Sequence, residues 1–530
     1  MDLIDGAVKK GTDKTGMQEI DHQTWDEFDS VRKGRKLVLF GAGACAEFFL
    51  YRYCISEPIE AVIDNNKAGM TLENCFEYTY GTANSHLLVR DEKVLKKYDP
   101  EEIVIIICST NHCTEILNRL YSYGMKHVFV LHIMELNERA EKGIYDVEPV
   151  TWEQKNNFFA EEARKSPIEQ KKIVFYAFGS YSDHGKYISE MLWKQRKDLD
   201  IVWLLNESHM HDAVPDYVRV IPVEQQYKYI YEMSTAHIWV FNLEVPSFIE
   251  KREGQIYFQA KHWASVTLKK CYLDSCTLTN SPYYEDWVRN SSMMDYIFTG
   301  SPFDSDFCRR AFGFKGETLE VGSARTDILF TPEEASARIR ELYQIPQNAK
   351  ILMYAPTFRY KDGDCSKGCE YILPADFPLI KNALEERFGG EWMILLRLHP
   401  NVQPRVGKLQ MEPWVRNATA YSDSQELVAA CDVLISDFSS IMFEPAFVHK
   451  PVFLLADDFD SYVDKEYELA IEYESLPFSR AATNEQLVEN IRRYEEQEYI
   501  ARVDAFMKHY GVKEDGHAAE RAAKYISDLI

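Results

Sequence analysis

The chain has 530 residues and a formal net charge of −24, and 46% of its residues are hydrophobic against 27% that are charged. Because a single hydrophobic core stops growing at about 250–300 residues, we expect two to four folded domains. The acidic balance argues against a nucleic-acid groove and against adhesion of the whole surface to an anionic membrane.

The chain shows no targeting or membrane-spanning pattern. Its first twenty residues lack the apolar stretch of a signal peptide, and apolar runs such as 103–108 are too short to cross a bilayer. We therefore expect a cytoplasmic protein. The 11 cysteines include no CxxC pair, which favours free thiols over a zinc site.

The first predicted domain covers residues 1–148 and alternates strand-like with helix-like segments. The turn after its first strand contains Gly41 and Gly43, and its second strand ends at Asp64. In a Rossmann-like domain, such glycines approach a pyrophosphate and the acidic residue holds a ribose hydroxyl. Two interpretations stay open: binding of NAD or a nucleotide sugar, and a nucleotide-free module that mediates contacts. The strands are expected at 36–40, 59–63, 103–108 and 127–131.

Two further α/β units follow a charged, helical connector at 149–168, and they cover 169–330 and 331–530. Two consecutive Rossmann-like domains with a cleft between them describe the GT-B architecture. We therefore predict an α/β chain in which an N-terminal Rossmann-like domain precedes a GT-B pair with a central cleft. Ligands in such sheets bind beyond the carboxyl ends of the strands. Strands are expected at 172–176, 201–205, 236–241, 350–354, 392–397 and 432–436.

The segment 261–270 (KHWASVTLKK) follows a short predicted strand and holds one histidine and a lysine pair. An imidazole with a pKa of about 6.5 can accept the proton of an attacking hydroxyl, so His262 is a candidate general base. Lys269 and Lys270 are candidates for attracting a polyanionic acceptor. On these residues alone a structural role is favoured, with Trp263 in the core and the lysines on a solvated face.

Four more motifs follow predicted strands in the second half of the chain. Arginine offers fixed donors that suit phosphate, and serine hydroxyls at a helix start form an anion site together with free N–H groups. The last motif is expected to open an amphipathic helix and to hold a diphosphate without a metal. Helix caps, a surface ion pair and a buried histidine are the structural alternatives. The motifs are GSARTD with Arg325 and Asp327, YAPTFR with Thr357 and Arg359, RLHP with His399, and SDFSS with Asp437, Ser439 and Ser440.

In this order, the five motifs resemble those of the CDP-glycerol glycerophosphotransferase family, the teichoic-acid-polymerase-like enzymes, over about residues 170–510. The resemblance implies a GT-B-like enzyme that needs no metal or other cofactor. It implies that His262 activates an acceptor hydroxyl, which attacks the β-phosphorus of the donor and releases CMP. The donor-binding group that it implies consists of Arg325, Asp327, Thr357, Arg359, His399, Asp437, Ser439 and Ser440.

The expected function is that of a phosphotransferase that moves a polyol phosphate from a CDP-activated donor to a teichoic-acid-like or capsular polymer. Glycerol phosphate is the first candidate for the transferred group. Its partners would be the CDP-polyol and a polyanionic or lipid-linked acceptor at the inner face of the cell membrane, without nucleic acid. Two alternatives stay open: a GT-B glycosyltransferase that uses a nucleotide sugar, and a non-catalytic scaffold. Ala324 and Glu444, where the family has proline and more often aspartate, leave the polyol and the acceptor open.

Acidic triplets at 304–306, 362–364 and 457–460 imitate the DxD metal motif of other transferases. Such triplets are common by chance in a chain this acidic, so we predict no metal site.

Overall fold

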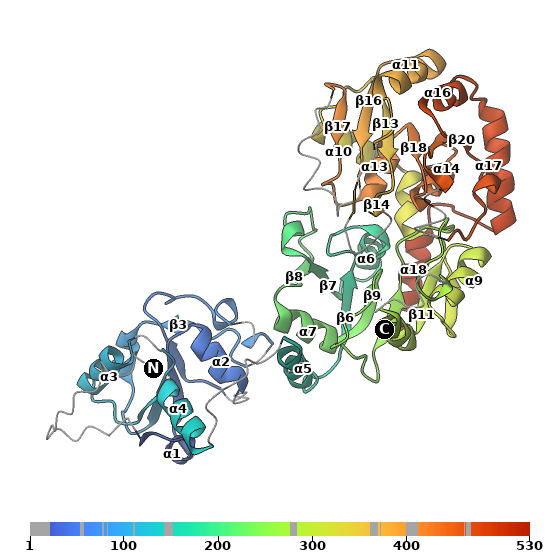
Figure 1. Cartoon of the computed structure of the whole chain (residues 1–530). Coiled ribbons are helices and arrows are strands. Elements are labelled where there is room, and N and C mark those ends of the chain that lie inside the picture. Colours follow the sequence, from blue (N-terminus) through green and yellow to red (C-terminus); the bar gives the residue numbers. More distant parts are fainter. Residues whose placement is uncertain are drawn as a thin grey trace. The chain divides into compact units, whose positions relative to one another are not determined.

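The computed structural model contains three separate parallel sheets (Figure 1). The chain divides into two compact units, one that runs to Glu162 and includes Gln225–Tyr231, and one made of Ala163–Glu224 with Glu232–Ile530. The structure describes residues 22–52, 58–76, 79–81, 83–109, 112–142, 152–275, 283–360, 369–370, 373–398, 412–460, 462 and 468–530.

The N-terminal sheet has the strand order β3-β2-β1-β4-β5, and every neighbouring pair is parallel. This is the strand order of a Rossmann-like sheet. Its central strands are uninterrupted aliphatic runs because both faces of a parallel sheet are covered. The strands are β1 (Lys36–Phe40), β2 (Ala61–Ile63), β3 (Val89–Arg90), β4 (Ile103–Ile107) and β5 (Val128–Val130), with helices α1 (Trp25–Arg32), α2 (Ala44–Arg52), α3 (Cys113–Ser122), α4 (Leu131–Glu141) and α5 (Trp152–Ala163).

The middle sheet has seven parallel strands in the order β12-β11-β10-β9-β6-β7-β8. The last helix of the chain, α18 (Ala518–Ser527), contributes Ala518, Ala522 and Ile526 to the core of this sheet and lies among its green elements in Figure 1. The strands are β6 (Glu169–Tyr176), β7 (Asp200–Leu205), β8 (Val218–Pro222), β9 (Ala236–Phe241), β10 (Ile256–Gln259), β11 (Tyr296–Thr299) and β12 (Glu317–Glu320), with helices α6 (Asp183–Gln195), α7 (Gln226–Thr235), α8 (Tyr284–Met293) and α9 (Pro302–Ala311).

The C-terminal sheet has six parallel strands in the order β17-β16-β13-β18-β19-β20. A separate antiparallel pair joins β14 (Arg359–Tyr360) to β15 (Cys369–Glu370). The six strands are β13 (Lys350–Ala355), β16 (Trp392–Leu396), β17 (Val415–Asn417), β18 (Val433–Ser436), β19 (Val452–Leu455) and β20 (Ser479–Ala481), with helices α10 (Glu333–Leu342), α11 (Phe377–Phe388), α13 (Ser424–Ala430), α14 (Phe443–Ala446), α16 (Asn484–Arg492) and α17 (Glu496–Tyr510).

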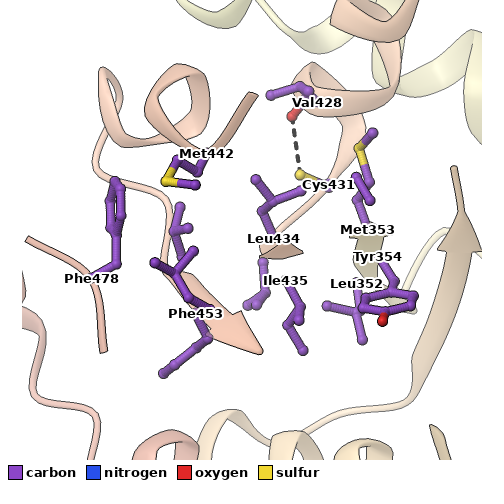
Figure 2. Packing of buried hydrophobic residues seen from close by; sticks show 14 of the residues in the cluster. Leu352, Met353, Tyr354, Val428, Cys431, Leu434, Ile435, Met442, Phe453 and Phe478 are labelled. Atoms are coloured by element: carbon purple, nitrogen blue, oxygen red, sulfur yellow. Dashed lines mark hydrogen bonds between the residues drawn. The ribbon is translucent and has the colours of Figure 1, made fainter. Parts of the chain in front are cut away.

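The core of the C-terminal sheet packs side chains of adjacent strands against the segment that follows β18 (Figure 2). Leu352 and Leu434 lie on neighbouring strands, and Met442, which follows β18 in the chain, belongs to the same buried cluster. Cys431 donates its thiol hydrogen to the Val428 carbonyl at 3.2 Å, and burial raises the pKa of this thiol to about 11. Cys431 is therefore a core residue with an unreactive thiol.

The structure confirms the predicted α/β class with Rossmann-like sheets. The prediction of an amphipathic helix after Asp437 is wrong. Ser440–Met442 form a single 3₁₀ turn, and α14 has only four residues. All four residues of α14 are buried, so this helix has no solvent-exposed face and is not an amphipathic surface helix. The domain boundaries at 148, 168 and 330 stay predictions.

Within the described ranges, no helix is both long enough and apolar enough to cross a membrane. Among the same residues, no three or more His, Cys, Asp or Glu side chains gather in a way that could hold a metal ion.

Candidate active site

A tight turn directly after β10 carries His262. Lys261 has a left-handed backbone (φ 51°), and its buried ammonium group donates to the carbonyls of Trp263 and Ala264 at 2.8 Å each. The same ammonium group pairs with Asp304 at 3.1 Å, and Asp304 also accepts the Trp263 indole N–H at 2.8 Å. Lys261 and Asp304 thus hold the turn in place.

The His262 imidazole lies between aromatic rings. Its ring centroid is 5.4 Å from that of Phe178, 5.0 Å from that of Trp263 and 6.5 Å from that of Tyr272. Burial lowers the pKa of His262 to about 4, although the nearby Asp183 carboxylate acts in the opposite direction. Nδ1 is buried and has no hydrogen-bond partner among the described residues. The ring is therefore neutral at pH 7, and its buried Nδ1 forms no hydrogen bond with the described residues.

Left-handed backbone conformations of non-glycine residues gather around His262. Phe178 (φ 50°), Asp183 (φ 60°), Lys261 (φ 51°) and Tyr272 (φ 51°) are all in this region. Such conformations cost about 1–3 kcal/mol each and cluster at functional sites, where the surrounding structure enforces them. Four such residues around one imidazole indicate a site where the surrounding structure enforces backbone conformations that are unfavourable locally.

Arg325 connects the His262 turn to both sheets of its unit. Its Nη1 donates to the His262 carbonyl at 2.9 Å and to both carboxylate oxygens of Asp183 at 3.2 Å. Its Nη2 pairs with Glu444 of α14 at 2.8 Å, and Asn242 donates to Asp183 at 3.0 Å. The side chain is 8% exposed. Both terminal nitrogens of this predicted phosphate ligand are thus engaged by protein groups.

Asp327, the acidic residue of the GSARTD motif, holds the start of α18. Its carboxylate oxygens accept the backbone N–H groups of Ala518 at 3.0 Å and Ala519 at 2.7 Å. Burial raises the pKa of Asp327 to about 6. The geometry gives Asp327 a helix-capping role that links the last helix to the middle sheet.

Adjacent strands β13 and β18 bring Thr357, Arg359 and Asp437 together. The Thr357 backbone N–H donates to Asp437 at 2.8 Å, and Arg359 pairs with Asp437 at 3.0 Å. Arg359 also makes two bonds to Asp458, at 2.6 and 2.9 Å, and its guanidinium lies 4.7 Å from the Tyr462 ring centroid. The Thr357 hydroxyl oxygen is buried without a hydrogen-bond partner. A polar, partly unsatisfied group therefore lies at this strand edge, and its role in binding the donor stays a prediction.

The SDFSS motif meets the segment that follows His262. The Ser440 hydroxyl lies 3.1 Å from the Thr267 hydroxyl and accepts the Leu268 N–H at 3.1 Å. Ser439 caps the 3₁₀ turn by accepting the Ile441 N–H at 3.4 Å. The two motifs, which are separated by about 170 residues, are thus in direct contact.

Lys269 and Lys270 contact residues of the C-terminal part of the chain. Lys270 donates its backbone N–H to the Glu468 carbonyl at 2.9 Å and its ammonium group to the Glu468 carboxylate at 3.1 Å. Lys269 forms a bridge with Leu469 and donates to the Tyr462 hydroxyl at 3.2 Å. Both lysines therefore have protein partners, and their acceptor role stays a prediction. His399 and the triplet 362–364 lie outside the described residues.

Asp64 accepts a backbone hydrogen bond from the glycine-containing turn that follows β1. Gly41 has φ 111°, and a Cβ atom there would lie 2.8 Å from the Cys108 carbonyl oxygen, so only glycine fits. Gly43 has open space where a Cβ would be. The Asp64 carboxylate accepts the N–H groups of Ala42 at 3.0 Å and Asn66 at 2.9 Å. Both Asp64 oxygens thus have partners within the chain.

A cavity of about 920 Å³ lies elsewhere in the second unit and does not include His262. Lys186 on its wall pairs with Asp423 at 2.7 Å and Glu426 at 2.6 Å, which joins α6 to α13. Its other walls carry side chains of both signs, with Glu190 and Asp212 beside Lys194 and Arg338.

Sequence reasoning missed the residues that hold His262 in place, which are Lys261, Asp183, Asp304 and Glu444. Local signals existed for two of them. Asp183 ends a glycine-serine turn after β6, and Glu444 follows the SDFSS motif at the position where the family more often has aspartate.

Comparison with known proteins places these observations in a family. The sequence model described as "CDP-Glycerol:Poly(glycerophosphate) glycerophosphotransferase" matches residues 158–528. A teichoic acid poly(glycerol phosphate) polymerase of Staphylococcus epidermidis is 27% identical over 84% of this chain, which spans only 59% of that relative's length. A teichoic acid glycerol-phosphate transferase of Staphylococcus aureus is 26% identical over 68% of this chain and 94% of its own. A structure of the wall teichoic acid polymerase TagF, from a variant soaked with CDPG, covers 71% of this chain and 93% of its own with 26% identity and a TM-score of 0.60.

Proposed function

Since the chain belongs to the CDP-glycerol:poly(glycerophosphate) glycerophosphotransferase family, we propose that it transfers glycerol phosphate from CDP-glycerol to a hydroxyl of a teichoic-acid-like polymer. The observation that carries the proposal is the neutral His262 imidazole, with a buried, unpartnered Nδ1, on a turn next to the segment that contacts the SDFSS motif. The names of the relatives support glycerol phosphate as the transferred group.

The proposed reaction is a single displacement at the β-phosphorus of the donor. The acceptor oxygen forms a bond to this phosphorus while the bond to the bridging oxygen breaks, and CMP leaves with the electron pair. His262 takes the proton of the attacking hydroxyl, which is a poor nucleophile while it keeps that proton. Because CMP is a good leaving group, stabilisation of charge on the transferring phosphoryl group matters more than protonation of the leaving oxygen.

The donor phosphates are proposed to bind where β13 and β18 end. The unpartnered Thr357 hydroxyl and the hydroxyls of Ser439 and Ser440 supply hydrogen-bond donors there. Arg359 adds its guanidinium if its bonds to Asp437 and Asp458 exchange for phosphate. Arg325 reaches the same region only if its bonds to Asp183 and Glu444 exchange for phosphate, so we propose that it positions the His262 turn. A lipid-linked acceptor would bring the reaction to the inner face of the cell membrane.

The test is CMP release by the purified full chain from CDP-glycerol, with and without a synthetic acceptor that carries glycerol phosphate, in the presence of EDTA. Acceptor-dependent release in EDTA is expected. If CDP-glycerol and CDP-ribitol stay intact while a nucleotide sugar is consumed, the protein is a glycosyltransferase. If no donor turns over, the scaffold interpretation holds.

The acid limb of kcat/KM for CMP release is expected near pH 4 and not near 6.5. The active form is the neutral imidazole, and burial lowers its pKa from 6.5 to about 4, so protonation removes the base only at lower pH. In kcat the limb should lie at higher pH, because the negative charge of the bound donor raises the pKa of His262. Recovery of activity after return to neutral pH controls for unfolding. A kcat/KM that is already halved near pH 6.5 would contradict the assignment.

For the N-terminal sheet we propose a role without nucleotide, because both Asp64 oxygens are occupied by N–H groups of the chain. NAD, UDP-sugars and CDP-glycerol are each expected to leave the melting temperature of this sheet's transition unchanged. A ligand at 100 times its Kd would stabilise by about 2.7 kcal/mol, which a thermal scan detects easily. A rise with NAD or a UDP-sugar that disappears in Asp64→Asn would overturn the proposal.

A further inference from the structure

We propose that a preformed subsite beside His262 binds an uncharged, hydroxyl-bearing unit of the acceptor, next to the hydroxyl that attacks. The subsite is a cavity of about 400 Å³ between the loop after β9 and helix α8. This proposal rests on the proposed function and adds to it the chemical class that the acceptor side recognises. The cavity is lined by Glu244, Val245, Pro246, Ser247, Tyr272, Tyr283, Asp286, Trp287 and Asn290.

The position of the cavity follows from the topology of the middle sheet. β9 and β10 are neighbouring parallel strands, so the loop after β9 and the His262 turn after β10 leave the sheet at the same edge. Tyr272 joins the two places, because its ring centroid is 6.5 Å from that of His262 and 5.5 Å from that of Trp287. The Tyr272 ring therefore lies between an acceptor unit in the cavity and the proposed base His262.

The walls are held in place by contacts that do not depend on a ligand. The buried Asn290 side chain accepts the Val245 N–H at 2.7 Å and donates to the Val245 carbonyl at 3.1 Å. Arg289 donates to the Ile249 carbonyl at 3.0 Å and also to that of Val245. These bonds fasten the loop to α8. The Tyr272 ring stacks on Phe312 at 4.9 Å, so this wall is fixed as well.

The chemistry of the lining selects against phosphate. Glu244 and Asp286 contribute carboxylates, and the described lining residues include no lysine, arginine or histidine. A phosphate group would be repelled there, whereas hydroxyl groups can donate to both carboxylates. The faces of Tyr272 and Trp287 suit the C–H surface of a sugar or polyol. A neutral polyhydroxyl unit satisfies both kinds of wall.

Two variants test the subsite, each with a matched control on α8. Trp287→Leu and Glu244→Gln are expected to raise the acceptor KM for CMP release about tenfold, which is the loss of one ring contact or hydrogen bond, while the CDP-glycerol KM stays within about twofold. Tyr284→Leu and Glu285→Gln change residues of the same types outside the lining and are expected to leave both constants unchanged. Melting temperatures check that all four variants are folded.

Two acceptors distinguish the sources of the neutral unit. One is a synthetic glycerol phosphate oligomer, and the other is the same oligomer attached to a disaccharide. An effect of Trp287→Leu on both acceptors assigns the cavity to the polyol, and an effect on the disaccharide form alone assigns it to a sugar. Unchanged acceptor KM values in both lining variants, or equal changes in the donor KM, would overturn the subsite.

Failure of the proposed function is recognisable separately, because the wild-type chain then releases no CMP. In that case calorimetric titration of the wild type and Trp287→Leu with the two oligomers still decides the matter. Weaker binding to the variant supports the subsite, and equal or absent binding overturns it.

Discussion

Replacing His262 with alanine is expected to lower kcat for acceptor-dependent CMP release by about 10²–10⁴-fold, the usual contribution of a general base. The acceptor hydroxyl then has no neutral nitrogen to take its proton. Donor binding should change little, because the proposed phosphate contacts come from the ends of β13 and β18. CMP release with saturating CDP-glycerol measures the effect, and His262→Asn should behave like the alanine variant.

His449→Asn provides a matched histidine control. His449 lies in the C-terminal part of the same unit, is paired with Asp504 at the surface, and has a left-handed backbone (φ 58°) that asparagine tolerates. Its variant should keep full activity. If His262→Ala also keeps full activity while the wild type is active, the base is another group, and the unpartnered Nδ1 needs a different explanation.

Arg325→Met is expected to destabilise the second unit by about 3–5 kcal/mol, because it leaves the buried carboxylates of Asp183 and Glu444 without their common cation. The side chain of Arg325 is 8% exposed and that of Glu444 1% exposed, so water cannot replace the lost partner. The shift of the unfolding midpoint in urea measures the loss.

A second variant distinguishes lost pairing from poor packing. Adding Glu444→Gln to Arg325→Met removes one unpaired charge and should recover part of the stability. Arg492→Met, which breaks a surface pair with Glu386, should leave the midpoint where it is. An unchanged midpoint in Arg325→Met would mean that the guanidinium is not committed to these carboxylates and is available to a phosphate.

Much of the fold could be predicted from local sequence. β1, β4 and β13 lie within one residue of their predicted ranges, because strands covered on both faces of a parallel sheet are nearly uninterrupted apolar runs. The approach of Thr357 to Asp437 was predictable for a related reason. Each follows its strand at the carboxyl end, and neighbouring parallel strands bring those ends to one edge.

The sequence by itself thus determined the three α/β sheets, the family and the position of His262 after β10. Only the tertiary structure decided what the neighbouring side chains do. Arg325 finds Asp183 at a separation of 142 residues, and Asp327 caps a helix 191 residues away. The segment after Asp437 forms a 3₁₀ turn followed by the four buried residues of α14, and not an amphipathic surface helix. Ion pairing and burial depend on contacts between segments that are distant in the sequence. The hydrophobic periodicity of a local segment does not predict such contacts.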